Sequence, residues 1–252
     1  MLLAVDVGNS NIHFGIWDGE AWKYQKRVET HRVNDEKGFM GVLQQFTDEN
    51  TIDASAIGSG IISSVVPKVN QPLSAAIDKV VGFRPVLLNA ETDAGITLAT
   101  EHPEQVGADL IADAAGAYEL VNDTCLVVDF GTATTVMAVE KPGMLTGGAI
   151  CAGLKVSIEA LVGKTAQLQE IPLEIPPSPL GKNTVECMQS GLVLGHLCMV
   201  EGLIDRMKSE LGAAKVVATG GLVSLLASQT QYFNYVEPML TLNGLRRIAE
   251  RQ

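Results

Sequence analysis

One short pattern occurs twice in the chain, and it restricts the possible folds more than any other feature. Residues 2–6 form an apolar run that ends in an Asp, and a polar segment containing Gly follows at once. Residues 124–129 repeat this arrangement. Residues 11–17 then alternate polar and apolar side chains as a half-buried strand does, and residues 136–140 supply the corresponding strand of the second copy. The sequence therefore predicts two similar halves, each beginning with two strands joined by a tight turn.

The rest of the pattern completes an α/β protein of two domains. We expect the first domain to span residues 1–115 and the second residues 116–252, with a terminal helix that can pack back on the first. The Pro-rich residues 172–179 are interpreted as a stiff insertion. Further strands are expected at residues 22–28, 56–63, 85–88, 144–150 and 215–219, and helices at residues 39–46, from 67 onward, at 109–120, at 187–211 and near 248.

Composition limits the classes of function. The chain has 18 Lys and Arg against 29 Asp and Glu, a net charge of −11, and its mean hydropathy is +0.20. Wholly disordered chains combine low hydrophobicity with high charge, so that class is excluded. An acidic chain is also a poor partner for nucleic acid. Because no apolar run reaches the ~18 residues of a spanning helix and no basic leader is visible, we expect neither a membrane partner nor a signal peptide. Four cysteines without metal-type spacing favour a cytoplasmic location.

Both turns have the composition of a phosphate-binding loop. Gly8 and Gly131 remove side chains that would keep backbone N–H groups away from a phosphate. Asp6 and Asp129 can hold a cation beside the phosphates, directly or through water. Each turn alone could be a plain hairpin, but two matching copies favour phosphate binding. Further hydroxyl and amide donors are Ser10, Asn11, Thr132, Thr134 and Thr135.

A glycine pair follows a third buried strand. Gly220 and Gly221 open the next helix, where a base or ribose could lie against the bare backbone. Tight packing of the helix on the strand would require the same glycines, so this signal is weak alone.

Together these elements resemble the nucleotide-binding parts of the superfamily that contains sugar kinases, heat-shock chaperone ATPases and actin. Within it, the chain resembles the type III pantothenate kinases over nearly its whole length. The resemblance implies two ribonuclease-H-like domains with mixed sheets flanked by helices and a nucleotide cleft between them. The segments that carry it are residues 6–11, 64–67, 103–109, 129–135, 147–150 and 181–184.

The resemblance also implies roles for individual residues. Asp109 would be the general base, although it could equally be the N-cap of the following helix. Asp129 would bind a monovalent cation, K⁺ or NH₄⁺, and Asp6 would hold Mg²⁺ through water. ATP would contact Asp6, Val7, Gly8, Asn9, Ser10, Asn11, Ile12, His13, Gly131, Thr132, Thr134, Gly220 and Gly221. The acceptor would contact Thr100, Gly107, Ala108, Asp109, Leu110 and Thr184, the last from across a homodimer interface.

The expected function is ATP-dependent phosphorylation of pantothenate to 4'-phosphopantothenate, the first step of coenzyme A biosynthesis. The chain departs from the family on the acceptor side, where Leu110 replaces an Arg, Thr100 a Tyr and Ala152 a Pro. Two alternatives follow: a kinase of the same fold that acts on another small hydroxyl compound, or a non-catalytic regulatory member. The apolar segment 188–203 fits either a homodimer helix or a core helix.

Overall fold

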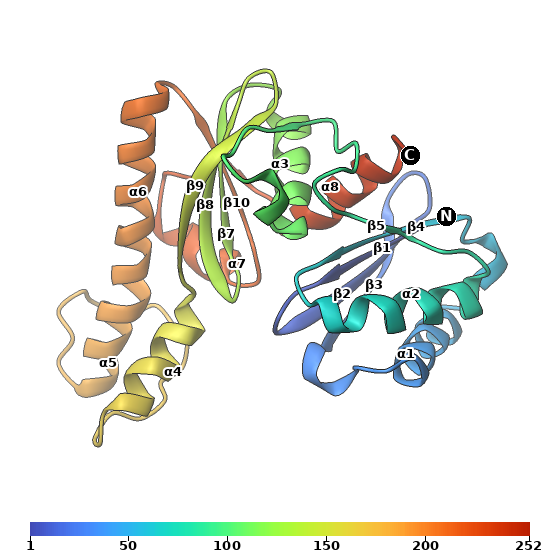
Figure 1. Cartoon of the computed structure of the whole chain (residues 1–252). Coiled ribbons are helices and arrows are strands. Elements are labelled where there is room, and N and C mark those ends of the chain that lie inside the picture. The colour runs from blue at the N-terminus through green and yellow to red at the C-terminus, as the bar shows by residue number, and fades with distance from the viewer. The chain divides into compact units, whose positions relative to one another are not determined.

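The computed structural model describes residues 1–252 and divides into two compact units. The first unit contains Met1–Glu119 together with Met239–Gln252, and the second contains Leu120–Pro238. Figure 1 shows the elements of both units along the chain. The expected boundary after residue 115 falls inside helix α3 (Ala108–Val121). The chain therefore leaves the first unit at the end of this helix and returns to it for the last 14 residues, 239–252.

The first unit is built on a five-stranded mixed sheet with the order β3-β2-β1-β4-β5. β1 pairs antiparallel with β2, and β2 with β3, so the three expected strands form an antiparallel meander. β4 runs parallel to β1, and β5 runs parallel to β4. The strands are β1 (Leu2–Val7), β2 (Asn11–Trp17), β3 (Trp22–Glu29), β4 (Ser59–Ser64) and β5 (Val86–Leu87), and a further short strand is β6 (Thr97–Leu98).

Helices cover both faces of this sheet (Figure 1). α1 (Glu36–Glu49) and α2 (Pro67–Val81) pack on the face formed by Leu3, Val5 and Phe14. The opposite face, which includes Ala4 and Ile61, packs against α3 and the terminal helix α8 (Leu240–Ala249). The 3₁₀ turns are Thr30–Arg32, Ala54–Ala56, Pro103–Gln105 and Ala227–Gln229.

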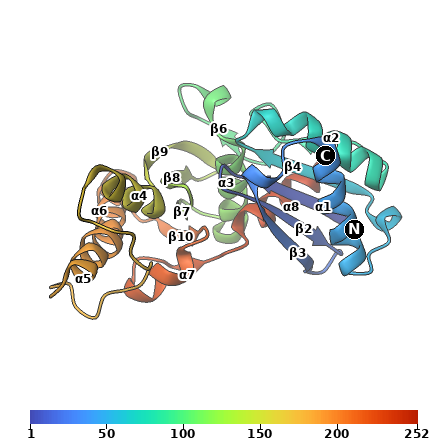
Figure 2. The ribbon, with the colours of Figure 1, turned by 90° about the horizontal axis from the view of Figure 1, so that it is seen from below.

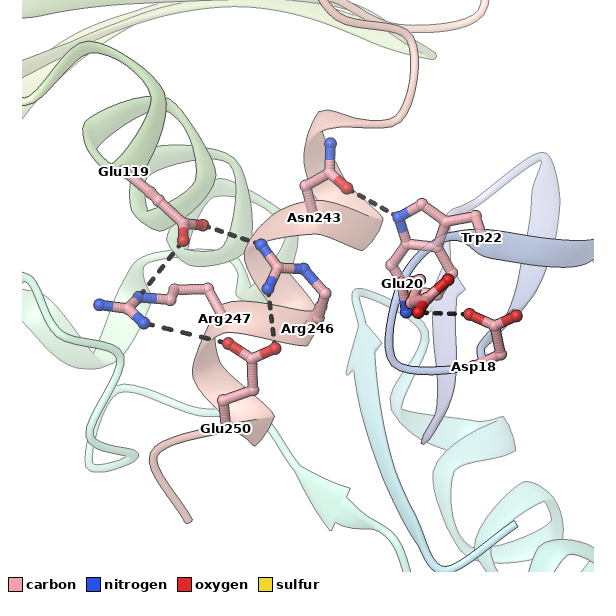
Figure 3. A network of polar contacts seen from close by, with 8 residues as sticks. All are labelled: Asp18, Glu20, Trp22, Glu119, Asn243, Arg246, Arg247 and Glu250. Atoms are coloured by element: carbon pink, nitrogen blue, oxygen red, sulfur yellow. Dashed lines mark hydrogen bonds and ion pairs between the residues drawn. The ribbon is translucent and has the colours of Figure 1, made fainter. Parts of the chain in front are cut away.

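The terminal helix is joined to the first unit by polar contacts as well as by its apolar face (Figure 3). Arg246 lies 3.3 Å from Glu119 of α3, and its guanidinium stands 5.0 Å above the ring of Trp17. Nε1 of Trp22 donates to Asn243 at 2.7 Å. These contacts span more than 100 residues of sequence, which explains why the last helix belongs to the unit that contains the first strand.

The second unit repeats the topology of the first. Its strands have the order β11-β10-β7-β8-β9, with β7, β8 and β9 antiparallel and with β10 and β11 parallel to β7. In the order β9-β8-β7-β10-β11, each strand has the same direction and neighbours as its counterpart in the order β3-β2-β1-β4-β5 of the first sheet. The predicted two-copy architecture is therefore confirmed. The strands are β7 (Cys125–Phe130), β8 (Ala133–Glu140), β9 (Met144–Ala152), β10 (Lys215–Thr219) and β11 (Tyr235–Val236).

The second unit differs mainly in its helices, which gather beside the sheet in both views (Figures 1 and 2). The predicted helix at 187–211 begins three residues earlier and contains a π-helical turn. The sequence pattern did not predict α4 (Leu154–Lys164). The helix expected after Gly221 is only a single turn, α7 (Val223–Leu226). The long helix consists of α5 (Thr184–Gln189), the π-helical turn η4 (Ser190–Leu194) and α6 (Gly195–Leu211).

By length and composition alone, the continuous helix Thr184–Leu211 could cross a membrane. This is weak evidence for a span, because core helices of water-soluble proteins pass the same test. Val193, Leu197 and Val200 lie in the hydrophobic core of the second unit. The helix thus has one face in the core and an opposite face, including Cys198 and Met199, that is exposed.

Candidate active site

The first turn connects β1 to β2 and is closed by its own backbone. Gly8 N donates to Asn11 O at 2.9 Å, which bends the chain back on itself. A residue outside the motif holds the turn in place: the buried Thr30 donates from Oγ1 to Gly8 O at 2.7 Å, and its N–H donates to Ser10 O at 3.0 Å. The sequence reading missed Thr30, although its position one residue after β3 places it beside the start of β2.

Side chains of the first turn point in two directions. Val7 and Ile12 are buried in the core under α1 and α2, so they present only backbone to a ligand. Asn9 and Ser10 are exposed. This arrangement fits a backbone cradle for phosphate.

Asp6 lies in a row of polar side chains across the first sheet. It pairs with His13 on β2 and with Ser63 on β4, and residues directly opposite one another in a sheet share a face. Burial, together with the charge of Arg27, lowers the pKa of His13 to about 4, while a contact of 3.1 Å from Nε2 to Oε1 of Gln25 opposes that shift. His13 is therefore neutral at physiological pH and brings no positive charge to a phosphate.

The second turn connects β7 to β8 and is enclosed by glycines from two other segments. Gly131 N donates to Ala133 O and Gly153 N donates to Thr132 O, each at 3.1 Å. A Cβ at Gly153, which precedes α4, would lie 2.5 Å from Gly131 O. A larger residue at this position would push the turn away from the start of the helix.

Gly220 brings the end of β10 against the same turn. Its φ of +97° favours glycine, and a Cβ there would lie 2.5 Å from Phe130 N and would collide with the carboxylate of Asp129. Gly221 is exposed, with open space where a Cβ would stand. The structure thus brings Asp129, Gly131, Thr132 and Gly220 together, as the sequence reading expected.

Thr134 and Thr135 take opposite faces of the second sheet. Asp129 pairs with Thr135, so these two side chains share a face. The hydroxyl of Thr134 is buried on the other face, where Oγ1 lies 2.9 Å from Nε2 of His196 on α6. Thr134, named from the sequence as an ATP contact, therefore has its hydroxyl engaged in the core, and Thr135 is the neighbour that faces the Asp129 side.

Asp109 lies in the first turn of α3. The helix starts at Ala108, so Gly107 rather than Asp109 precedes it, and Asp109 is not its N-cap. Oδ1 of Asp109 accepts a hydrogen bond from Leu110 N at 2.8 Å, and a Cβ at Gly107 would lie 2.5 Å from that oxygen. Burial raises the pKa of Asp109 above the ordinary Asp value, although backbone hydrogen bonds oppose the shift. A carboxylate with a raised pKa is a stronger proton acceptor.

The start of α3 lies at the edge of the first sheet where Asp6 stands. A Cβ at Gly107 would be 3.6 Å from Val65, which directly follows β4, and β4 runs parallel to β1. The structure therefore groups Asp6 with Asp109 in the first unit.

Thr100, the other expected acceptor contact of this unit, is half-buried, and its Oγ1 is a buried atom without a hydrogen-bond partner.

Thr184 lies at the start of the long helix. It is the first residue of α5, whose N-cap Asn183 accepts a hydrogen bond from Glu186 N at 3.0 Å. Thr184 also lines an open apolar groove of about 530 Å³, together with Leu161, Leu168, Cys187, Met188, Gly191 and Leu192.

Each turn, taken by itself, supplies one Asp carboxylate that suits a metal arriving with a nucleotide. No group of three or more His, Cys, Asp or Glu side chains in the chain could hold a metal ion. Mg²⁺ in phosphoryl-transfer sites commonly uses one or two carboxylates together with phosphate oxygens and water. Asp6 and Asp129, each next to a glycine turn that a Cβ would crowd, match that requirement.

Comparison with known proteins agrees with this geometry. Residues 2–206 match the family described as type III pantothenate kinase. The type III pantothenate kinase of Moorella thermoacetica is 41% identical over 252 residues, covering 100% of this chain and 99% of the relative. The enzyme of that name from Myxococcus xanthus is 42% identical over 254 residues, covering 100% and 98%.

A solved structure shares the fold at much lower identity. A Sinorhizobium meliloti protein assigned as a 2-dehydro-3-deoxygalactonokinase superposes with a TM-score of 0.65 and 16% identity, covering 100% of this chain and 96% of that one. The shared feature is an α/β fold with mixed sheets flanked by helices. The family match over most of the chain, together with more than 40% identity over its full length, shows that this chain belongs to the type III pantothenate kinase family.

Proposed function

We propose that the protein transfers the γ-phosphoryl group of ATP to the hydroxyl group of pantothenate, the reaction that begins coenzyme A biosynthesis. The observation that carries this proposal is a half-buried carboxyl at Asp109 in a chain of this family that also has two strand–Asp–glycine turns. Phosphoryl transfer depends on positioning and on charge stabilisation, and these are what such turns provide.

Asp109 is the proposed general base. The acceptor oxygen forms a bond to the γ-phosphorus, the bond from that phosphorus to the ADP oxygen breaks, and the hydroxyl proton passes to the Asp109 carboxylate. ADP and the phosphate ester are the products. Gly107 leaves room for the carboxylate, and burial favours its protonated form after the transfer.

The two turns are proposed to hold the phosphates through backbone N–H groups at Asn9 and Thr132, while the N–H groups of Gly8 and Gly131 close the turns. Asp6 is proposed to hold Mg²⁺ through water and Asp129 to hold K⁺ or NH₄⁺. When bound, these cations neutralise charge on the phosphate oxygens. Gly220 leaves the Asp129 carboxylate unobstructed, because any Cβ there would occupy its space.

An ADP-release assay tests the reaction. Wild-type protein with Mg²⁺, K⁺ and ATP should release ADP only when pantothenate is added, and Asp109→Asn should remove that release. The matched control is Asp48→Asn, which neutralises an exposed carboxyl on α1 and should leave the rate unchanged. Turnover that survives Asp109→Asn would contradict the assigned base.

A different acceptor is the second candidate, and one observation favours it. Thr100 presents a buried hydroxyl without a partner, and the apolar Leu110 stands next to Asp109. These two residues offer a hydroxyl contact but no cation for a carboxylate. The same assay with uncharged alcohols related to pantothenate decides between the two. Faster turnover on a neutral analogue than on pantothenate would favour this candidate, and no ADP release with any acceptor would leave the regulatory alternative.

We also propose that the protein is a homodimer that joins through the exposed face of the long helix. Small side chains follow one another along this face at spacings of three or four residues, which permits close approach of a second helix. These residues are Cys187, Gly191, Gly195, Cys198 and Gly202. Leu180, which is 80% exposed, and the apolar groove beside α5 add surface that a second copy would cover.

The cysteines allow a specific test of this dimer. Cys187 and Cys198 are both exposed on that face, so an antiparallel pair of helices around an axis near Leu192 and Val193 brings each Cys187 opposite the partner's Cys198. A short bis-maleimide should then produce a covalent dimer, which Cys187→Ser or Cys198→Ser should abolish. Cys125→Ser, a change at a buried strand residue, is the control. A monomer mass by light scattering at micromolar concentration would contradict the proposal.

A further inference from the structure

His196 makes a buried hydrogen bond to the strand that leaves the second phosphate turn. Its Nε2 lies 2.9 Å from Oγ1 of Thr134, and the two residues are 62 positions apart in sequence. They are 7% and 1% exposed. Because leaving either group buried without its partner is costly, this contact ties helix α6 to the start of β8.

The contact reaches both ends of the turn. Thr134 stands two residues beyond Thr132, and its backbone pairs with Phe130, the last residue of β7. The ring of Phe130 packs against the imidazole of His196 with 6.2 Å between ring centres. His196 therefore contacts the residue that enters the turn and the strand that leaves it.

The π-helical turn sets the rotation of the helix that carries His196. The buried residues Met188 and Val193 are five positions apart across this turn, whereas Val193, Leu197 and Val200 continue at the three- and four-residue spacing of an α-helix. One extra residue is thus accommodated before His196, which faces the core. Such π-helical turns are frequent at functional sites.

We propose that His196 is a positioning residue: through Thr134 and Phe130 it fixes the second phosphate turn, and with it the Asp129 carboxylate, in the geometry that binds ATP. This inference rests on the proposed function, because it assigns a role within the same site. The His196 ring does not touch the ligand in this role. It sets the position of the Thr132 backbone that does.

The test compares nucleotide affinity with stability in matched variants. Thr134→Val keeps the shape but removes the hydroxyl, and losing one hydrogen bond should raise the KM for ATP about five- to tenfold. The KM for the acceptor should stay unchanged. His196→Leu should raise the KM for ATP to the same extent. The double variant should have a KM for ATP no higher than that of the more affected single variant, because the two substitutions remove the same contact. Thr134→Ser and His196→Gln, which can still make the bond, should restore most of the affinity.

Val200→Ala is the control for a merely structural role. It truncates a buried side chain one turn further along α6, so it should lower thermal stability and leave the KM for ATP unchanged. If Thr134→Val and His196→Leu behave in the same way as this control, the proposed positioning role is wrong and the proposed function stands. If wild-type protein fails to bind an ATP analogue in titration calorimetry, the proposed function fails, and this inference fails with it. If His196→Leu does not fold, Thr134→Val and its Ser counterpart decide the question alone.

Discussion

The β1–β2 turn and the β7–β8 turn occupy equivalent places in two sheets of the same topology, yet they are held by different means. The burial patterns of β1 and β7 are identical, with a half-buried Asp in the fifth position of each strand. The first turn is anchored by Thr30, which directly follows the third strand of its own meander. The second is enclosed by Gly153, Gly220 and, through Thr134, His196. The two copies thus share the same strand–Asp–turn pattern, although different residues contact and position each turn.

The two copies also differ in the helix that comes after the last strand of each sheet along the chain. α3 comes after β5 and β6 and carries Asp109 as its second residue, whereas α8 comes after β11, packs in the first unit and carries Thr241 at that position. Only the helix of the first copy therefore has a carboxyl at this position. Under the proposed function, we expect phosphate binding at both turns and base catalysis at Asp109 alone.

The largest expected effect tests that asymmetry. Asp109→Asn keeps the side-chain shape but removes the proton acceptor, so turnover should fall by ~10²–10⁴, the usual contribution of base catalysis. Thr241→Ala, at the equivalent position of the second copy, should leave turnover unchanged. Steady-state kinetics measure both, with ATP affinity unchanged in Asp109→Asn. Similar losses in the two variants would remove the distinction between the copies.

The pH dependence should report the same carboxyl. Because burial raises the pKa of Asp109, the rate should fall on the acid side with an apparent pKa above the ordinary Asp value of 3.8. The effect on stability has the opposite direction. A raised pKa means that the stabilising contribution is complete below 3.8 and is lost as pH rises through the folded-state value. Asp109→Asn should therefore be at least as stable as wild type at pH 7, in thermal melts over a pH series.

The next effect concerns the two strand-end carboxylates. Asp6→Asn and Asp129→Asn should each weaken ATP binding by roughly 10–100-fold, since charge-assisted contacts contribute about 1.5–3 kcal/mol. Only Asp129→Asn should also remove the stimulation by K⁺. Calorimetry with an ATP analogue, repeated with and without K⁺, separates them. If ATP binding responds to K⁺ in the same way in both variants, the proposed separate roles of Asp6 and Asp129 are wrong.

A smaller effect should come from the glycines that approach the turns. Gly220→Ala should lower the free energy of unfolding by about 1–3 kcal/mol, because it combines a positive φ with a collision against the second turn. Gly8→Ala should lower the free energy of unfolding by less, since its Cβ would meet only Asn11 O at 3.2 Å and its φ is not positive. Urea unfolding of both variants measures the difference, and equal losses would contradict the closer packing of the second turn.

The smallest expected effect tests the anchor of the first turn. Thr30→Val removes the hydroxyl that bonds Gly8 O, which should cost about 1 kcal/mol in unfolding free energy and weaken ATP binding a few-fold. Thr47→Val is a control, because Thr47 is also buried but bonds only within its own helix. If Thr47→Val weakens ATP binding as much as Thr30→Val, Thr30 has no special role at the turn.

Much of the local structure could be predicted because it depends on neighbouring residues. The apolar runs before Asp6 and Asp129 formed strands, and the strands expected at residues 11–17 and 22–28 formed β2 and β3. Helix α4 and the π-helical turn were missed, since neither has a periodicity that distinguishes it from its surroundings. The alternative of Asp109 as N-cap was wrong by two positions, because the helix begins at Ala108 and Gly107 precedes it.

The sequence by itself determined the two-copy strand pattern, the two glycine turns and the family, because all three depend on residue type and on short spacing along the chain. Only the tertiary structure decided that the last helix packs in the first unit, that Thr134 faces His196 rather than the Asp129 side, and that Gly153 and Gly220 enclose the second turn. The physical reason is distance along the chain. These contacts join residues separated by about 20 to more than 200 positions, and their geometry follows from how helices pack on a sheet, not from local preference.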